Sequence, residues 1–188
     1  MNLPNKLTVS RIILTLIFVI LLCRPGLFSK LAAAFIFTLA SLTDFFDGYY
    51  AKKHNIATNF GKLMDPIADK FLILAAFFVF ALMHLVAWWM FIVIFIREAG
   101  MTIMRLMAIQ KGKVLAAEKW GKYKTVFQIM TIGVILFYLI LQESRVLSGT
   151  WRFADIGTGL AIINFFMIIV VILTVGSGLH YLLNTKNS

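Results

Sequence analysis

The sequence predicts an all-α integral membrane protein, a bundle of six transmembrane helices. Hydrophobic residues make up 61% of the 188 residues, a share well above that of soluble domains. They lie in continuous runs, without the apolar and polar alternation that a membrane β-barrel requires. The chain contains no internal repeat or low-complexity tract, so residues 1–188 are expected to form a single membrane domain.

Six apolar runs define the expected helices, and each is bounded by polar or turn-forming residues. They cover Leu7–Cys23, Leu31–Ala51, Ile67–Leu82, Val86–Met107, Val126–Leu141 and Ile156–Leu183. The first run has an amphipathic start and is expected to stay as a helix, because the residues around Cys23 do not form a cleavage site for a signal peptide. Cys23 is the only cysteine, which excludes a disulfide within the chain.

The cationic residues predict the orientation of the bundle. With six spans, most lysines and arginines fall on the side of the two termini; the other side holds only Arg24, Lys30, Arg145 and Arg152. The positive-inside rule therefore places both termini in the cytoplasm; location in the bacterial cytoplasmic membrane is implied only by the family resemblance described below. The net charge of +10 largely reflects this asymmetry. Nucleic-acid binding is a poor explanation, because the basic residues flank membrane spans.

Four aspartates occur within 26 residues of this otherwise apolar chain, at Asp44, Asp47, Asp65 and Asp69. Carboxylates at membrane depth need a counter-charge, a metal or a polar cavity. The two pairs are three and four residues apart, so each pair lies on one face if the backbone is helical. Such an all-oxygen set suits Mg²⁺ or Mn²⁺. The sequence predicts a polar active-site cavity facing the cytoplasm, with Asp65 capping the third helix.

The aspartates belong to a longer pattern that resembles the signature of a known family. Asp44, Asp47, Gly48, Ala51, Lys52, Gly61, Asp65 and Asp69 follow the spacing D-x2-D-G-x2-A-[RK]-x8-G-x3-D-x3-D. This pattern is similar to that of the CDP-alcohol phosphotransferases, membrane enzymes of phospholipid synthesis. The one departure is Lys52, where the family usually has arginine. Lysine keeps the charge but loses the two-pronged donor that grips a phosphate.

The resemblance implies a role for each matching residue. Asp44, Asp47 and Asp65 would bind one or two divalent ions, with two favoured. Asp69 would lie at the same metal site and act as general base. Gly48, Ala51, Lys52 and Gly61 would lie along the cytidine diphosphate of the lipid donor, although Gly48 by itself is equally explained by close helix packing.

Cationic residues in the fourth run, and in the expected loop just before the fifth run, point to an anionic acceptor. Arg97 and Glu98 interrupt an apolar run, and Glu98 shares a helix face with Arg105, so Arg105 or Arg97 is the expected partner of Glu98. Lys124, Gln128 and Thr131 are spaced to form a polar stripe. The candidate acceptor-phosphate residues are thus Arg97, Arg105, Lys122 and Lys124. For the lysines, positive-inside charge near anionic lipid heads is the competing explanation.

Longer stretches resemble one branch of the family, the bacterial phosphatidylglycerophosphate synthases. They are residues 2–11, 64–70, Arg97-Glu98 with Arg105, and 121–125. The resemblance implies transfer of the phosphatidyl group of CDP-diacylglycerol to glycerol 3-phosphate, with CMP released, by a homodimer. Asn5 and Thr8, with Arg11, would line the nucleotide side; a helix cap and interfacial anchor is the alternative.

Two other functions remain open at this point. A transferase of the same family could use phosphatidylglycerol, giving cardiolipin, or inositol phosphate as acceptor. A divalent-cation transporter could also hold aspartates around a metal within the membrane. The transporter leaves Gly48, Ala51 and Gly61 unexplained, and no acidic path continues to the other membrane side.

Overall fold

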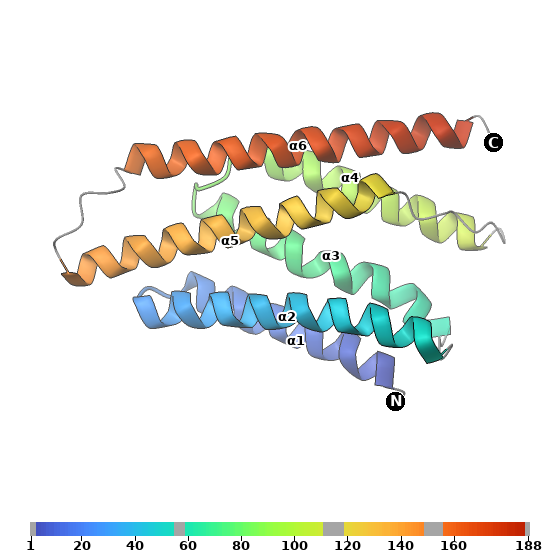
Figure 1. The fold of residues 1–188 in the computed structure, drawn as a ribbon, viewed down its shortest axis with the longest axis horizontal. Helices are drawn as coiled ribbons and strands as arrows, with labels where there is room; N and C mark the ends of the chain where they lie inside the picture. The colour runs from blue at the N-terminus through green and yellow to red at the C-terminus, as the bar shows by residue number, and fades with distance from the viewer. Residues whose placement is uncertain (1–2, 55–58, 111–118, 149–155, 187–188) are drawn as a thin grey trace. The chain divides into compact units, whose positions relative to one another are not determined.

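The chain is helical throughout its described elements (Figure 1). The computed structural model describes the backbone of residues 3–54, 59–110, 119–148 and 156–186, and side chains within 9–42, 70–104, 107, 123–144 and 157–180. The helices are α1 (Leu3–Cys23), α2 (Leu27–His54), α3 (Asn59–Leu82), α4 (Trp88–Gln110), α5 (Lys119–Ser148) and α6 (Ile156–Lys186). Each overlaps one predicted run, and α4 begins two residues after its run does, which confirms the all-α class for the described residues.

The helices extend beyond the apolar runs, and this corrects two expectations. α3 begins at Asn59 rather than at Ile67, so Asp65 lies inside the helix and the prediction that it caps α3 is wrong. α5 begins at Lys119, which places Lys122 and Lys124 on the helix rather than in a loop. Hydropathy marks where apolar residues stop, whereas lysine, methionine and leucine all favour continued helix.

Among the described residues, two with a positive φ angle lie in the connections between helices. Gly26, with φ of 104°, lies between α1 and α2, and glycine adopts this geometry without steric cost. His84, with φ of 58°, follows α3. There the amide of His84 donates to the carbonyl of Ala81 at 3.1 Å, and that of Leu85 to the carbonyl of Phe80 at 3.0 Å. These two bonds form a Schellman motif that satisfies the last carbonyls of α3.

The chain divides into two compact units, and α3 and α5 contribute to both. The first unit comprises Met1–Val79 and Leu136–Trp151. Within it α1 packs along α2. The rings of Phe18 and Phe37 meet with centroids 5.5 Å apart. Ala33 and Ala40 are fully buried on α2, and such small side chains permit close helix packing.

The second unit comprises Phe80–Ile135 and Arg152–Ser188. Within it α4 packs against α6. Its apolar core includes Ile94 on α4, Ile132 on α5, and Ile163 and Met167 on α6, all with 0% exposure. The unit also buries polar side chains from the same three helices, described below.

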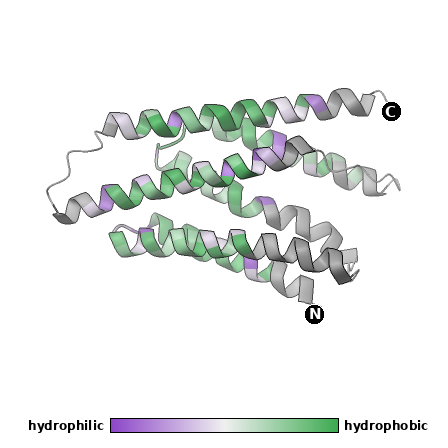
Figure 2. Cartoon of the chain, in the orientation of Figure 1, coloured by the Kyte–Doolittle hydropathy of each residue, from purple (hydrophilic) through white to green (hydrophobic). Residues whose placement is uncertain are grey.

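Much of the described part of the helices is hydrophobic (Figure 2), and many large apolar side chains are exposed while several charged ones are buried. Phe28 is 83% exposed and Phe165 62%, whereas Lys30 and Glu98 are each 3% exposed. This is the reverse of a soluble protein. Tyr123–Ser144 in α5 and Gly157–His180 in α6 are long and apolar enough to cross a membrane. Shorter apolar helical stretches cover Val9–Cys23, Leu27–Leu42 and Lys70–Leu82.

Candidate functional site

The four aspartates lie on two helices of the first unit. Asp44 and Asp47 are on α2, and Asp65 and Asp69 are on α3. With helical backbone at both places, spacings of three and four residues put each pair on one helix face. Their side chains lie outside the described residues. The described side chains do not include these four aspartates. Among the described side chains, no group of three or more His, Cys, Asp and Glu residues could hold a metal ion.

The remaining residues of the family pattern are also helical. Counted from Asp44, Asp47 is at i+3, Gly48 at i+4 and Ala51 at i+7. One face of α2 therefore carries two carboxylates and two very small residues. Lys52 is next in the chain, and Gly61 is one turn before Asp65 on α3. The side chains of these residues lie outside the described ranges, and their predicted contacts with the nucleotide stay predictions.

On α1, the predicted stripe of Asn5, Thr8 and Arg11 continues with Thr15. The side chains of Asn5 and Thr8 are outside the described ranges. Arg11 is 4% exposed and Thr15 1%. The hydroxyl of Thr15 donates to the carbonyl of Arg11 at 2.8 Å. Arg11 therefore does not lie at the molecular surface, as an interfacial anchor would.

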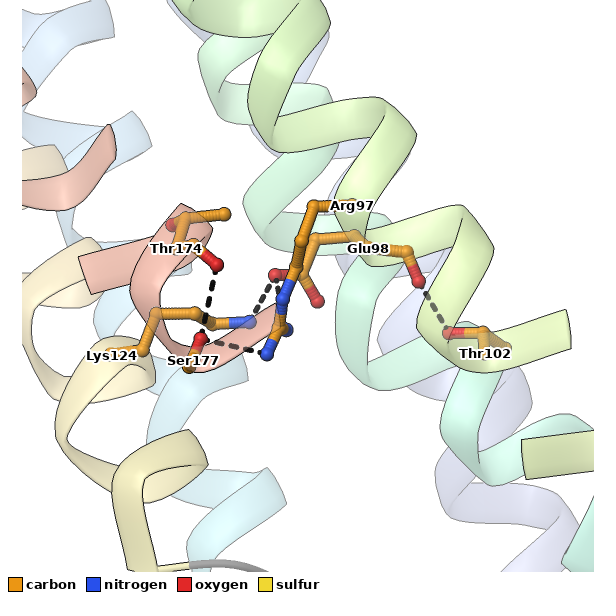
Figure 3. A network of polar contacts seen from close by, with 6 residues as sticks. All are labelled: Arg97, Glu98, Thr102, Lys124, Thr174 and Ser177. Carbon is orange, nitrogen blue, oxygen red and sulfur yellow. Dashed lines mark hydrogen bonds and ion pairs between the residues drawn. The ribbon is translucent and has the colours of Figure 1, made fainter. Parts of the chain in front are cut away.

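Arg97 and Glu98 of α4 join a polar network of the second unit with Lys124 of α5 and Ser177 of α6 (Figure 3). Lys124 Nζ forms an ion pair with Glu98 Oε1. Arg97 Nη1 lies 3.1 Å from the same oxygen. Of the two partners predicted for Glu98, Arg97 is confirmed, whereas the side chain of Arg105 lies outside the described residues. The pairing of Glu98 with Lys124 was not predicted.

Burial makes this network costly to build. The side chains of Glu98 and Lys124 are 4% and 3% exposed, and that of Arg97 is 13% exposed. Removing such ions from water costs several kcal/mol each, and pairing repays this only with good geometry and further hydrogen bonds. A more stable core could be built from apolar residues of similar volume. The network therefore calls for a functional explanation.

Among the described side chains of the second unit, three buried polar atoms have no hydrogen-bond partner: Arg97 Nε, Gln128 Nε2 and Thr174 Oγ1. Thr174 lies beside the network in Figure 3, and Gln128 is one turn after Lys124 on α5. Leaving such a group unsatisfied costs about 1–3 kcal/mol. A nitrogen donor of a cation without a partner, next to a second buried cation, is a feature suited to binding an anion.

The predicted polar stripe of α5 faces inward. Lys124, Gln128 and Thr131 are 3%, 1% and 0% exposed. The competing explanation for Lys124 is an exposed lysine that follows the positive-inside rule. The burial of Lys124 does not fit that explanation. Arg105 lies two turns after Glu98 along α4, and Lys122 lies on the first turn of α5. Their side chains are outside the described ranges.

Ser177 and Gly178 of α6 are the network residues that sequence reasoning missed. Arg97 Nη2 donates to Ser177 Oγ at 2.8 Å. The closest approach to a side chain placed at Gly178 would be Arg97 Cγ, at 3.4 Å. Neither residue carries charge, so nothing in their residue types pointed to a site. The one available signal was the pair Thr174 and Ser177, three residues apart in a very apolar segment.

Comparison with known proteins identifies relatives across most of the chain. The family model described as CDP-alcohol phosphatidyltransferase matches residues 1–176. The CDP-diacylglycerol–glycerol-3-phosphate 3-phosphatidyltransferase of Bacillus subtilis is 39% identical over 173 residues, covering 86% of this chain and 88% of the relative. The protein of the same name from Escherichia coli K12 is 36% identical, covering 72% and 77%. A probable phosphatidylglycerophosphate synthase of Mycobacterium tuberculosis is 38% identical, covering 73% and 67%.

Proposed function

The chain belongs to the CDP-alcohol phosphatidyltransferase family, and we propose that it transfers the phosphatidyl group of CDP-diacylglycerol to glycerol 3-phosphate, giving phosphatidylglycerophosphate and CMP. The relatives named above support this acceptor. The observation in this chain that carries the proposal is the buried pair of cations, Arg97 and Lys124, which both contact the carboxylate of Glu98. Such a pair suits an acceptor that brings its own phosphate.

The donor is assigned to the aspartate-bearing helices α2 and α3. Their carboxylates form a hard oxygen donor set of the kind that fits Mg²⁺ or Mn²⁺. We assign one or two ions, with two favoured, to Asp44, Asp47, Asp65 and Asp69. When bound, the ions supply neutralisation of the diphosphate and of the departing CMP. Asn5, Thr8, Gly48, Ala51, Lys52 and Gly61 are assigned to the CDP-lipid.

Asp69 is proposed as the general base. The acceptor hydroxyl oxygen forms a bond to the phosphorus of the phosphatidyl group, and the bond from that phosphorus to the CMP oxygen breaks. The hydroxyl proton passes to the carboxylate of Asp69, and CMP departs with the bonding electron pair. Asp69 is the last of the four carboxylates of the family pattern, and a carboxylate is among the groups that serve as general base.

The acceptor phosphate is assigned to Arg97, Arg105, Lys122 and Lys124. A guanidinium offers phosphate two parallel donors, and an ammonium offers a compact charge. The four residues are on α4 and α5 of one unit. The burial of Lys124 and of most of Arg97 strengthens each contact, because a poorly hydrated cation keeps more of its attraction for an anion.

The wider arrangement is proposed in the same way. We propose six transmembrane spans in one membrane domain, which agrees with the number of helices. The charge distribution supports placing both termini in the cytoplasm, and the family supports a homodimer. The apolar surfaces of α5 and α6 support membrane insertion. Arg97 and Glu98 lie within the proposed fourth span, where ionisable groups mark a functional site more often than a structural one.

The decisive experiment measures CMP release from CDP-diacylglycerol against the concentration of each acceptor. Glycerol 3-phosphate is expected to be used, while glycerol, inositol phosphate and phosphatidylglycerol are poor acceptors. Arg105→Ala is expected to raise the KM for glycerol 3-phosphate about tenfold or more, as expected for a lost hydrogen bond between charged groups. The KM for CDP-diacylglycerol should change little.

Asp69→Asn is the matched control for the chemical step, since it keeps the side-chain size but removes the base. It should abolish CMP release with every acceptor and leave CDP-diacylglycerol binding largely intact. Equal use of glycerol and glycerol 3-phosphate by the parent protein would refute the acceptor assignment. Faster turnover with phosphatidylglycerol or inositol phosphate would favour another branch of the family. Metal flux into liposomes without any CDP-lipid would favour a transporter.

A further inference from the structure

The orientation of Arg97 is controlled by α6. Arg97 lies on α4, and its Nη1 lies 3.1 Å from Glu98 Oε1 on the same helix. Its Nη2 donates to Ser177 Oγ on α6 at 2.8 Å. A guanidinium is a rigid plane, so fixing two of its nitrogens on partners from two helices fixes the direction of the third, Nε. Nε is buried without a hydrogen-bond partner.

Ser177 is itself held in place as an acceptor. It is 4% exposed, and its hydroxyl donates to the carbonyl of Thr174 at 3.1 Å, one turn earlier on α6. A serine hydroxyl has one hydrogen and two lone pairs. Because the hydrogen is used on Thr174, a lone pair of the oxygen remains to accept from Arg97. Ser177 can therefore hold Arg97 only as an acceptor.

Gly178 provides space for the stem of Arg97. The glycine is buried, and a Cβ placed there would lie 3.4 Å from Arg97 Cγ and 3.7 Å from Arg97 Nε. A single methyl group would just reach contact with the stem. A larger, branched side chain would occupy the space that the arginine now fills, and packed interiors accommodate such additions poorly.

We propose that Ser177 and Gly178 of α6 are positioning residues for the acceptor: they hold Arg97 in the one orientation in which it recognises the phosphate of glycerol 3-phosphate. The inference rests on the proposed function, since it assigns α6 a part in selecting the acceptor at that site. Neither residue needs to touch the substrate. Their effect is transmitted through Arg97 and should disappear when Arg97 is absent.

The test compares acceptor kinetics of variants in the full-length protein, purified in detergent and supplied with CDP-diacylglycerol. Ser177→Ala should raise the KM for glycerol 3-phosphate about three- to tenfold, the range for one hydrogen bond. Ser177→Thr keeps the oxygen and should restore most of the affinity. Gly178→Val should raise the KM about tenfold by displacing the arginine stem. In all three, the KM for CDP-diacylglycerol should stay near that of the parent.

Gly176 supplies the matched control for the glycine. It lies on the same helix, and a Cβ placed there would meet nothing within 4 Å. Gly176→Val makes the same change in helix propensity and bulk as Gly178→Val, and it should leave the acceptor KM unchanged. If both valine variants raised the acceptor KM equally, a general disturbance of α6 would explain the result and the proposal would be overturned.

A double-mutant cycle separates a positioning role from a merely structural one. In an Arg97→Ala background, Ser177→Ala should have no further effect on the acceptor KM, because residues acting through one contact are not additive. Full additivity would overturn the inference. An Arg97→Ala variant with parental acceptor KM would instead remove Arg97 from the acceptor site of the proposed function. A raised KM in Arg97→Ala with a parental KM in Ser177→Ala would overturn the positioning role alone.

Discussion

Lys30 and Lys124 are each 3% exposed, but their partners differ in kind. Lys30 Nζ donates to two neutral groups, the carbonyls of Leu22 at 2.6 Å and Arg24 at 3.0 Å. Lys124 Nζ pairs with the carboxylate of Glu98, which also holds Arg97. Lys30 belongs to the first unit and Lys124 to the second. Two lysines with equal burial thus have partners of different kinds.

The partners of Lys30 explain its burial in structural terms. Leu22 and Arg24 lie at the C-terminal end of α1 (Leu3–Cys23), where the last carbonyls have no partner within the helix. A cation there also meets the negative end of the helix dipole. Lys30 therefore completes the end of α1, and its two hydrogen bonds are accounted for by the fold.

The partners of Lys124 leave part of its environment unexplained by the fold. Glu98 receives a second cation from its own helix, and that cation, Arg97, keeps one buried nitrogen without a partner. The comparison teaches that the partners of a buried charge, rather than its burial, indicate whether it serves the fold or a ligand.

The largest expected effect comes from Lys124→Met, which separates the two lysines by activity. Losing one charge-assisted contact to the acceptor phosphate should lower kcat/KM for glycerol 3-phosphate roughly tenfold to hundredfold. Lys30→Met should leave this value within about twofold, because a helix-end contact makes no difference to the transition state. Both are measured as CMP release at varied acceptor concentration.

Lys124→Arg keeps a cation beside Glu98. It is the control that distinguishes lost acceptor binding from a damaged fold in Lys124→Met. Lys124→Arg should retain more activity than Lys124→Met at equal helix content by circular dichroism. If Lys30→Met and Lys124→Met lowered kcat/KM equally, the functional distinction between the two lysines would be wrong.

A smaller effect separates the two lysines by stability. Lys30→Met leaves two carbonyls at the end of α1 without their donor and should destabilise the protein by about 1–3 kcal/mol. The midpoint of thermal unfolding in detergent should therefore fall. Leu31→Met, at an exposed position one residue later, is the matched control and should have a parental midpoint. An unchanged midpoint in Lys30→Met would show that Lys30 does not stabilise α1.

The fold was predictable from the sequence because apolar runs of this length leave few alternatives. The helix ends were not, as Asn59 and Lys119 show: α3 and α5 continue through polar turns that hydropathy does not recognise. Within the site, Arg97 could be assigned to Glu98 because a buried carboxylate needs a nearby cation. The contacts of Lys124 with Glu98 and of Ser177 with Arg97 could not be predicted, since these residues reach the network from other helices and only tertiary packing brings them there.

The smallest expected effect concerns a third lysine, Lys52 of α2, which stands where the family usually has arginine. Lys52→Arg replaces a point charge by a planar fork that can hold two oxygens of a diphosphate. Activity should be retained, and the KM for CDP-diacylglycerol should fall about twofold, a few tenths of a kcal/mol. The KM for glycerol 3-phosphate should not change, which distinguishes Lys52 from Lys124. Loss of activity in Lys52→Arg would count against placing residue 52 along the cytidine diphosphate. Arginine keeps the positive charge and has the better donor geometry, so a diphosphate contact at this position should not become weaker.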